Sequence, residues 1–436
     1  MLDTGTTGII VGILLFFMLT FGVHIGVALG LSGVVGIFLA INPQASFAQV
    51  ATIPFSTTNS FTLAVIPLFI LMGALASQAG LTTDLYRAAY RWLGRISGGL
   101  AMATTLASAI FGAACGSTIV NAAVFTKMAM PEMTRFGYDK RISAGCIAAS
   151  GTLASLIPPS VLMIVYAVIT EQSVARLLIA GLIPGILSAA IYMLGIYFIA
   201  RLYPKLCPIP DERFTLREKI SSLKGVWGIM ALFTLVIGGI YLGFFVPTYA
   251  GAVGAFGAFM IVLLKGRMNS RALIETFKDA GITTSTIFIV VIGGIIFARF
   301  LTYTGLVRDV SDWMLAMELA PLTYMLAFAG LYLILGMLID PIAIMVMTLP
   351  IMFPVMTSVG YDPIWLGVIS IKLAEISLIT PPVGLNAYVV RSSSPVPLTL
   401  EQVFAGITPF LVMDVLTLAL LIAFPSIVTF LPNLMN

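Results

Sequence analysis

The sequence predicts an all-α polytopic membrane protein built from two inverted-topology repeats, each with a re-entrant helical hairpin and a broken helix. Three observations support this fold class: an apolar composition, two interrupted apolar segments, and a motif that occurs twice in the chain. Of the 436 residues, 60% are hydrophobic and 9% are charged. Soluble domains carry roughly 25% charged residues, so a chain this poor in charge needs lipid around most of its surface.

The apolar stretches have the length and pattern of membrane-spanning helices. A helix needs about 20 mainly apolar residues to cross the hydrocarbon layer, and such stretches recur from Gly8 to Leu431. Strands of a membrane barrel would alternate in polarity over about 10 residues, whereas residues 229–245 and 280–298 do not alternate. The net charge of +4 is small, and the basic residues lie in loops beside helices. This distribution sets membrane orientation and does not indicate nucleic-acid binding.

The first unusual segment, residues 96–126, is apolar but has basic residues at both ends. Arg91 and Arg95 precede it, and Lys127 and Arg135 follow it. Short loops rich in Lys and Arg lie in the cytoplasm, so both ends of the segment belong on that side. A single spanning helix cannot return to its own side, whereas a re-entrant hairpin does. A turn at membrane depth is tolerated where protein or water satisfies its backbone.

The second unusual segment, residues 323–353, lies in a region without any Lys or Arg from residue 309 to residue 371. It is interrupted at Asp340-Pro341, and proline disfavours continuation of the helix that precedes it. These features predict a second re-entrant hairpin, which opens from the outside of the membrane.

A motif of glycine, tyrosine and aspartate, followed by a double proline, occurs once in each half of the chain. The first copy is Gly137-Tyr138-Asp139 with Pro158-Pro159, and the second is Gly360-Tyr361-Asp362 with Pro381-Pro382. Every matched position is displaced by 223 residues (137 to 360, 158 to 381). Basic residues surround the first copy only, so the two copies belong on opposite sides of the membrane. Five predicted crossings separate the two hairpins, and this odd number also makes the repeats inverted.

The duplication divides the chain into residues 1–224 and residues 225–436. Within the first repeat we predict scaffold helices at 8–79, a hairpin at 96–126, a broken helix at 142–169, a helix at 177–200 and a cytoplasmic loop at 201–224. Within the second we predict helices at 226–298, a hairpin at 323–353, a broken helix at 364–390 and a helix at 404–431.

Inverted repeats with discontinuous helices are typical of secondary transporters. A double proline leaves carbonyl groups free and starts a half-helix inside the protein. Carbonyl and hydroxyl oxygens suit a hard cation such as Na⁺, while half-helix N-termini favour a carboxylate. We therefore predict ion or substrate binding by residues at the two hairpin tips and the two helix breaks, namely Gly116, Ser117, Thr118, Asn121, Gly151, Thr152, Pro158, Pro159, Asp340, Glu375, Thr380, Pro381, Gly384 and Asn386. The predicted sodium ligands are Ser117, Thr152, Asp340 and Thr380.

Each of these residues also has a purely structural interpretation. Serine and threonine in membrane helices often bond to their own backbone or pack between helices, and paired prolines can simply kink a helix. Glu375 could be a buried acid bonded to Thr380 or Asn386. His24, the single histidine, is better interpreted as a packed or interface residue than as a proton relay.

Catalytic motifs are missing from the sequence. It contains no Walker A loop, no HExxH and no CxxC, and its three cysteines have no metal or redox spacing. We therefore expect no enzyme activity and no cofactor other than Na⁺ as a coupling ion. A channel and an intramembrane protease remain alternatives from other functional classes.

Several motifs resemble the large, DctM-like membrane subunit of tripartite ATP-independent periplasmic (TRAP) transporters over essentially the full chain. They are Ile66-Pro67 to Gly73, Gly151-Thr152 to Pro158-Pro159, and Glu375 to Asn386 with its Thr380-Pro381-Pro382 core. The resemblance implies an elevator-type architecture like that of the ion transporter superfamily. It also implies sodium-coupled uptake of a carboxylate-bearing organic acid, such as a C4-dicarboxylate or sialic acid.

The resemblance further implies two protein partners, a periplasmic substrate-binding protein and a small four-helix, DctQ-like membrane subunit, in the bacterial inner membrane. The alternative function is a self-sufficient Na⁺/dicarboxylate-type symporter or anion transporter that needs no binding protein. The chain departs from the family pattern at Tyr249, where glutamate is frequent, and at Leu373-Ala374, where asparagine and methionine are frequent. If the usual side chains contact substrate, these departures predict an unusual specificity.

Overall fold

A computed structural model describes residues 3–435, and every regular element in that range is helical. Six helices are long and apolar enough to cross a membrane, and the number rises to eight if each of two bent helix pairs forms one span. The prediction of an all-α protein that crosses the membrane several times is therefore confirmed.

Five helices precede the first hairpin. The fourth and fifth are bent by 64° relative to each other at Gly80, whose φ of +69° favours glycine. The fifth is amphipathic, with most of its apolar residues buried and Arg87 exposed. These helices are α1 (Thr4–Thr20), α2 (Ile25–Ala40), α3 (Pro43–Thr58), α4 (Val65–Gln78) and α5 (Leu81–Leu93).

The first hairpin consists of α6 (Gly99–Cys115) and α7 (Thr118–Arg135), joined by Gly116-Ser117. Gly116 has a φ of +61°, and a Cβ atom on it would lie 2.9 Å from the carbonyl oxygen of Pro159. Glycine is thus required both by the turn and by the close approach of the broken helix. The helix α7 continues nine residues past the predicted hairpin end at 126, because Lys127 to Arg135 extend the same helix with their charged groups toward the surface.

The two interrupted helices are built in the same way. The first consists of α8 (Lys140–Leu156) and α9 (Val161–Ile169), which are bent by 45°, and the second of α19 (Pro363–Ile379) and α20 (Leu385–Ser393). Asp139 caps α8 and Asp362 caps α19 with their side-chain oxygens, so the repeated motif marks a helix start in both halves. The peptide bond within each proline pair is cis.

The remaining helices connect and enclose these parts. The stretch predicted as one helix at 404–431 is divided by Phe424-Pro425, where proline ends α21. The helices are α10 (Val174–Ala180), α11 (Leu182–Leu202), α12 (Leu216–Phe233) with a π-helical turn (Thr234–Gly238) and α13 (Gly239–Tyr241), α14 (Pro247–Leu264), α15 (Ser270–Tyr303), α16 (Leu306–Leu315), the second hairpin α17 (Pro321–Gly336) and α18 (Pro341–Ser358), α21 (Leu400–Ala423) and α22 (Ser426–Asn433).

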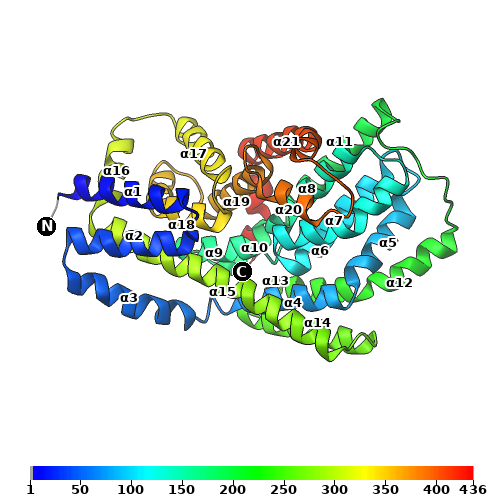
Figure 1. Cartoon of the computed structure of the whole chain (residues 1–436), viewed down its shortest axis with the longest axis horizontal. Coiled ribbons are helices and arrows are strands. Elements are labelled where there is room, and N and C mark those ends of the chain that lie inside the picture. The colour runs from blue at the N-terminus through cyan, green and yellow to red at the C-terminus, as the bar shows by residue number, and fades with distance from the viewer. Residues whose placement is uncertain (1–2, 436) are drawn as a thin grey trace.

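The broken helices lie in the middle of the molecule, between the hairpin α6–α7 on one side and the hairpin α17–α18 on the other (Figure 1). Residues 142–156 of α8 and 364–379 of α19 are all buried. Glycines allow α8 and α21 to cross closely, because a Cβ atom on Gly145 would lie 2.0 Å from the carbonyl oxygen of Gly406. The two interrupted helices therefore lie in the core of the molecule.

Candidate functional site

A cavity of about 380 Å³ lies where the tips of the two hairpins meet the beginning of α9. Gly116, Ser117 and Thr118 line it from the first tip, and Asp340 and Pro341 line it from the second. The opposite wall comes from α2, α4 and α15. The two segments that sequence analysis singled out as unusual are thus brought together at one cavity.

Four helices begin in the wall of this cavity. They are α2, α7, α9 and α18, and residues of the first turn of each line the cavity. Ser117 and Asp340 cap two of them: the N–H of Val120 donates to Ser117 Oγ over 3.5 Å, and the N–H of Ile342 donates to Asp340 Oδ1 over 2.9 Å. Since the first N–H groups of a helix carry partial positive charge, this arrangement favours an anion.

The cavity adjoins a second hollow of about 420 Å³ at the N-terminal end of α15. Ile70, Ser117, Val120 and Thr283 line both spaces. The second hollow extends to Glu275, near the N-terminal end of α15. Ser117 and Val120 of the first hairpin therefore lie at the boundary between the cavity and this second hollow.

Several predicted site residues lie behind the cavity wall and hold the tips and breaks in place. Asn121 Nδ2 donates to the carbonyl oxygens of Ser108 and Gly151, over 3.1 and 3.4 Å, which ties the first tip to α8. Asn386 Nδ2 donates to the carbonyl oxygen of Ala148 over 3.2 Å, which ties α20 of the second half to α8 of the first. Six further predicted residues do not line the cavity, namely Thr152, Pro158, Pro159, Thr380, Pro381 and Gly384.

The two threonine hydroxyls at the breaks are used within their own helices. Thr152 Oγ1 donates to the carbonyl oxygen of Ala149 over 2.8 Å, and Thr380 Oγ1 donates to that of Ile376 over 2.6 Å. The first break is fully buried, whereas Pro381 and Pro382 of the second are exposed. The two breaks are therefore alike in sequence but not in environment.

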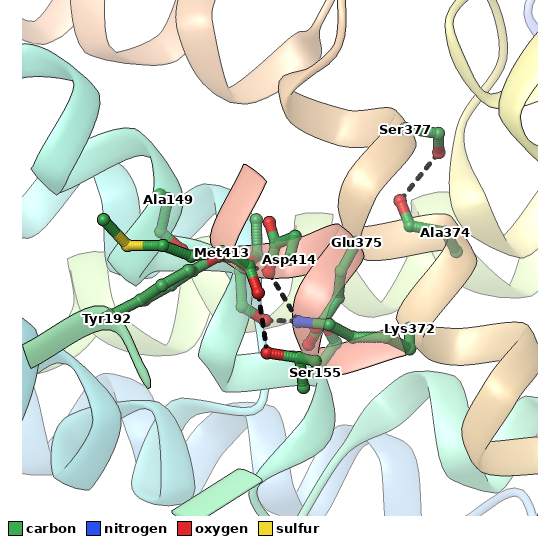
Figure 2. A network of polar contacts seen from close by, with 11 residues as sticks. Ala149, Ser155, Tyr192, Lys372, Ala374, Glu375, Ser377, Met413 and Asp414 are labelled. Atoms are coloured by element: carbon green, nitrogen blue, oxygen red, sulfur yellow. Dashed lines mark hydrogen bonds and ion pairs between the residues drawn. The ribbon is translucent and has the colours of Figure 1, made fainter. Parts of the chain in front are cut away.

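A buried ionic network lies behind the cavity, and α8, α11, α19 and α21 each contribute to it (Figure 2). Lys372 Nζ lies 2.7 Å from Asp414 Oδ1 and 3.2 Å from Glu375 Oε2. The hydroxyl of Tyr192 donates to Asp414 Oδ1 over 2.7 Å, and Ser155 Oγ lies 2.9 Å from Glu375 Oε1. All five side chains are buried, and Ser155 also lines the cavity.

Comparison with known proteins identifies the family. Residues 12–427 match the family model described as "Tripartite ATP-independent periplasmic transporter, DctM component". The chain is 36% identical over 408 residues to the C4-dicarboxylate TRAP transporter large permease protein DctM of Pseudomonas aeruginosa, which covers 93% of this chain and 94% of that protein. The chain belongs to the DctM family of TRAP transporters.

Another relative of this DctM-family chain is named for a different substrate. The chain is 31% identical over 377 residues to the sialic acid TRAP transporter large permease protein SiaM of Vibrio cholerae, covering 86% of this chain and 87% of that protein. These relatives are named as transporter permeases, so the prediction that the chain is a transport subunit and not an enzyme is confirmed. The solved YdaH transporter of Alcanivorax borkumensis shares the fold, with a TM-score of 0.60 and 15% identity over 88% of this chain and 90% of that one.

The positions at which this DctM-family chain departs from the expected motifs do not line the cavity. Tyr249 is 58% exposed at the start of α14, and Leu373 and Ala374 are fully buried in α19. Leu373 and Ala374 lie between Lys372 and Glu375, so they adjoin the ionic network.

Lys372, Asp414 and Tyr192 were not among the predicted site residues, and the suggested partners of Glu375 were wrong. Glu375 bonds to Lys372 and Ser155, and not to Thr380 or Asn386. Lys372 and Asp414 could have been identified from the sequence, because ionisable groups inside apolar stretches usually have a function and a partner. His24, which was interpreted as structural, lies in the cavity wall at the beginning of α2.

Proposed function

We propose that this chain is the carrier subunit of a sodium-coupled importer for a carboxylate-bearing organic acid, such as a C4-dicarboxylate or sialic acid. It acts in the bacterial inner membrane, receives the acid from a periplasmic substrate-binding protein, and pairs with a small four-helix, DctQ-like membrane subunit. The description of the family as tripartite supports the two partners. The names of the relatives from P. aeruginosa and V. cholerae support the substrate class.

The convergence of four helix N-termini on one cavity is the observation that carries this proposal. No Lys or Arg is among the described residues that line the cavity, so the ends of α2, α7, α9 and α18 supply its positive potential. Unpaired N–H groups at helix N-termini are suited to binding carboxylates and phosphates. A small organic acid of the kind named for the relatives therefore fits both the charge and the size of this space.

Oxygen ligands for Na⁺ adjoin the same cavity. Asp340 offers a carboxylate at the second tip, and Ser117 and Thr118 offer hydroxyl groups at the first. We propose that Thr380, next to the second proline pair, and Thr152, on α8 before the first pair, contribute further oxygen atoms to the ion site. A cation bound beside the acid would offset the repulsion between the acid and Asp340, which gives a physical basis for coupling the two.

The order of the helices supports two inverted repeats, at residues 1–224 and 225–436. In each, a hairpin precedes a broken helix, and five segments of spanning length lie between the hairpins: α8–α9, α10–α11, α12–α13, α14 and α15. The cavity lies between the hairpin tips and the helices α2, α4 and α15. In an elevator mechanism, the hairpins and broken helices would move past these three helices as one unit and carry the cavity with them.

Reconstitution tests the proposal. The chain and its small membrane partner are placed in proteoliposomes with an inward Na⁺ gradient, and uptake of radiolabelled succinate or sialic acid is measured with and without the cognate binding protein. We expect uptake only when both the binding protein and the Na⁺ gradient are present. Uptake without the binding protein would instead identify a self-sufficient symporter, and flux that does not saturate with substrate would identify a channel.

A further inference from the structure

The buried network contains one cation and two carboxyl groups. If Glu375 and Asp414 were both ionised, the ammonium group of Lys372 would leave one negative charge uncompensated in a region where none of the three side chains is exposed. An uncompensated buried charge is strongly unfavourable, and buried groups usually become neutral instead. The stoichiometry of the cluster therefore requires one additional positive charge.

Among residues 3–435, no other charged group pairs with these three side chains. The hydrogen bonds and ion pairs of the network come from four helices, α8, α11, α19 and α21. The helices α8 and α11 contribute only hydroxyl groups, those of Ser155 and Tyr192, so Lys372 on α19 is the one cation of the described network. Asp414 Oδ2 is buried and has no hydrogen-bond partner among the described residues. The missing charge is thus not provided by the side chains that face the cluster.

The geometry at Ser155 indicates where a proton resides. Ser155 Oγ lies 2.8 Å from the carbonyl oxygen of Thr152 and 2.9 Å from Glu375 Oε1. Both of these atoms are hydrogen-bond acceptors when Glu375 is ionised, but a serine hydroxyl has only one proton to donate. If Ser155 donates to Thr152, the contact with Glu375 is a hydrogen bond only when Glu375 carries the proton and donates it to Ser155 Oγ.

We propose that the Lys372–Glu375–Asp414 cluster is a proton-binding site, in which Glu375 Oε1 holds the proton and Ser155 connects it to the cavity. Lys372 then pairs with Asp414, the closer of its two carboxyl partners, and the whole cluster is neutral. The positions that correspond to Lys372 and Glu375 in the first half, 223 residues earlier, are Ala149 and Thr152. The lysine and the glutamate of the site are therefore found in the second copy of the motif only and are not a by-product of the duplication.

Infrared spectroscopy of the purified full-length protein in lipid tests the site without any transport assay. At neutral pH the wild type should show the C=O stretching band of a protonated carboxylic acid. Glu375→Gln should abolish the band, while Glu401→Gln, at an exposed position on α21, should leave it unchanged. Asp414→Asn should also abolish it, because Lys372 would then pair with an ionised Glu375. A band that survives Glu375→Gln, or that is lost in Asp340→Asn instead, would overturn the proposal.

Two further variants keep the test decisive if Glu375→Gln does not fold. Lys372→Met removes the cation, so both carboxyl groups should be neutral and the band should about double in intensity. Ser155→Ala leaves all charges in place but removes the acceptor of the Glu375 proton, so the band should shift to higher frequency. An unchanged band in both variants would contradict the proposed position of the proton.

A consequence for transport rests on the proposed function. Loss of the proton would leave a negative charge one hydroxyl group away from a cavity that takes an anion, which disfavours binding. Uptake by the reconstituted complex should therefore fall at alkaline pH in the wild type, and fall less in Glu375→Gln. If the infrared band behaves as described but the two pH profiles coincide, the site stands and its link to transport is wrong.

Discussion

Lys372 and Asp414 lie on different helices and form a salt bridge of 2.7 Å in which neither side chain is exposed. Asp414 also accepts a hydrogen bond from Tyr192, and Glu375 contacts Ser155. Lys372, Glu375 and Asp414 belong to the second half of the chain, whereas Tyr192 and Ser155 belong to the first. The network therefore joins the two halves at the centre of the protein.

Breaking the Lys372–Asp414 pair should destabilise the protein more than removing both partners. Loss of one member of a buried ion pair typically costs about 3–5 kcal/mol, because the other charge is left unpaired, whereas well-packed apolar replacements are often neutral. We expect Lys372→Met to lower thermal stability most, because it removes the only cation that pairs with the two carboxyl groups in the described network. Asp414→Leu should lower it less, since Lys372 can then pair with Glu375, and the double variant should be more stable than Lys372→Met. Thermal unfolding in detergent measures this, and additive effects of the two substitutions would contradict it.

Substitution of Ser117 should impair sodium-dependent uptake without preventing membrane insertion. Its hydroxyl lines the cavity and also caps α7, so Ser117→Ala removes a proposed ligand together with a cap that contributes about 1 kcal/mol. Ser173→Ala is a matched control, since Ser173 caps α10 in the same way but lies away from the cavity. We expect a higher Na⁺ concentration for half-maximal uptake in Ser117→Ala only. Equal Na⁺ dependence in both variants would leave Ser117 as a cap alone.

Cysteine labelling should place the repeated motif on opposite faces of the membrane. Arg135 and Ser358 are matched positions of the two repeats, 223 residues apart, and both are exposed. The three native cysteines are buried, so they should give little background. In intact cells a membrane-impermeant maleimide should label Ser358→Cys but not Arg135→Cys, and permeabilised cells should label both. Labelling of both variants in intact cells would be incompatible with inverted repeats.

The helix cap at Asp139 should lose strength in acid. Burial raises the pKa of this carboxyl group, but the hydrogen bonds and charge of Arg141 and the N–H of Ile142 outweigh burial and hold the pKa below its ordinary value. A group whose pKa is lowered by folding stabilises the protein above its unfolded pKa of about 3.9, and this contribution disappears as the pH falls through the lower folded value. Thermal stability of the wild type should therefore drop more steeply below about pH 4 than that of Asp139→Asn, which caps without a charge. Parallel curves would show that ionisation of Asp139 does not matter.

Most of the helix positions were predictable because their signals are local. Apolar runs of spanning length and prolines identified the broken helices at 142–169 and 364–390, whose breaks lie at residues 157–160 and 380–384 in the structure. The boundary at the end of α7 was missed because charged residues at a membrane surface can extend a helix as well as end it. The division between α21 and α22 was missed because Pro425 was included in an apolar run.

The candidate site was predictable in part. Sequence analysis identified the two tips, and Ser117 and Asp340 do line one cavity. It could not separate these residues from Asn121 or Asn386, which bond to backbone carbonyls behind the wall. All are polar residues beside breaks in apolar helices, and only the direction in which each side chain points distinguishes them.

The sequence by itself determined that this chain is a helical membrane protein in which one motif occurs twice, because composition, apolar run length and a repeated motif are properties of the chain alone. It even placed Lys372 three residues before Glu375, a spacing at which helical side chains meet. Only the tertiary structure decided that Asp414, Tyr192 and Ser155 complete that pair, and that four helix N-termini meet at one cavity. The physical reason is that contacts between helices depend on how their faces pack, and no local pattern of residues encodes which distant polar group will be the partner.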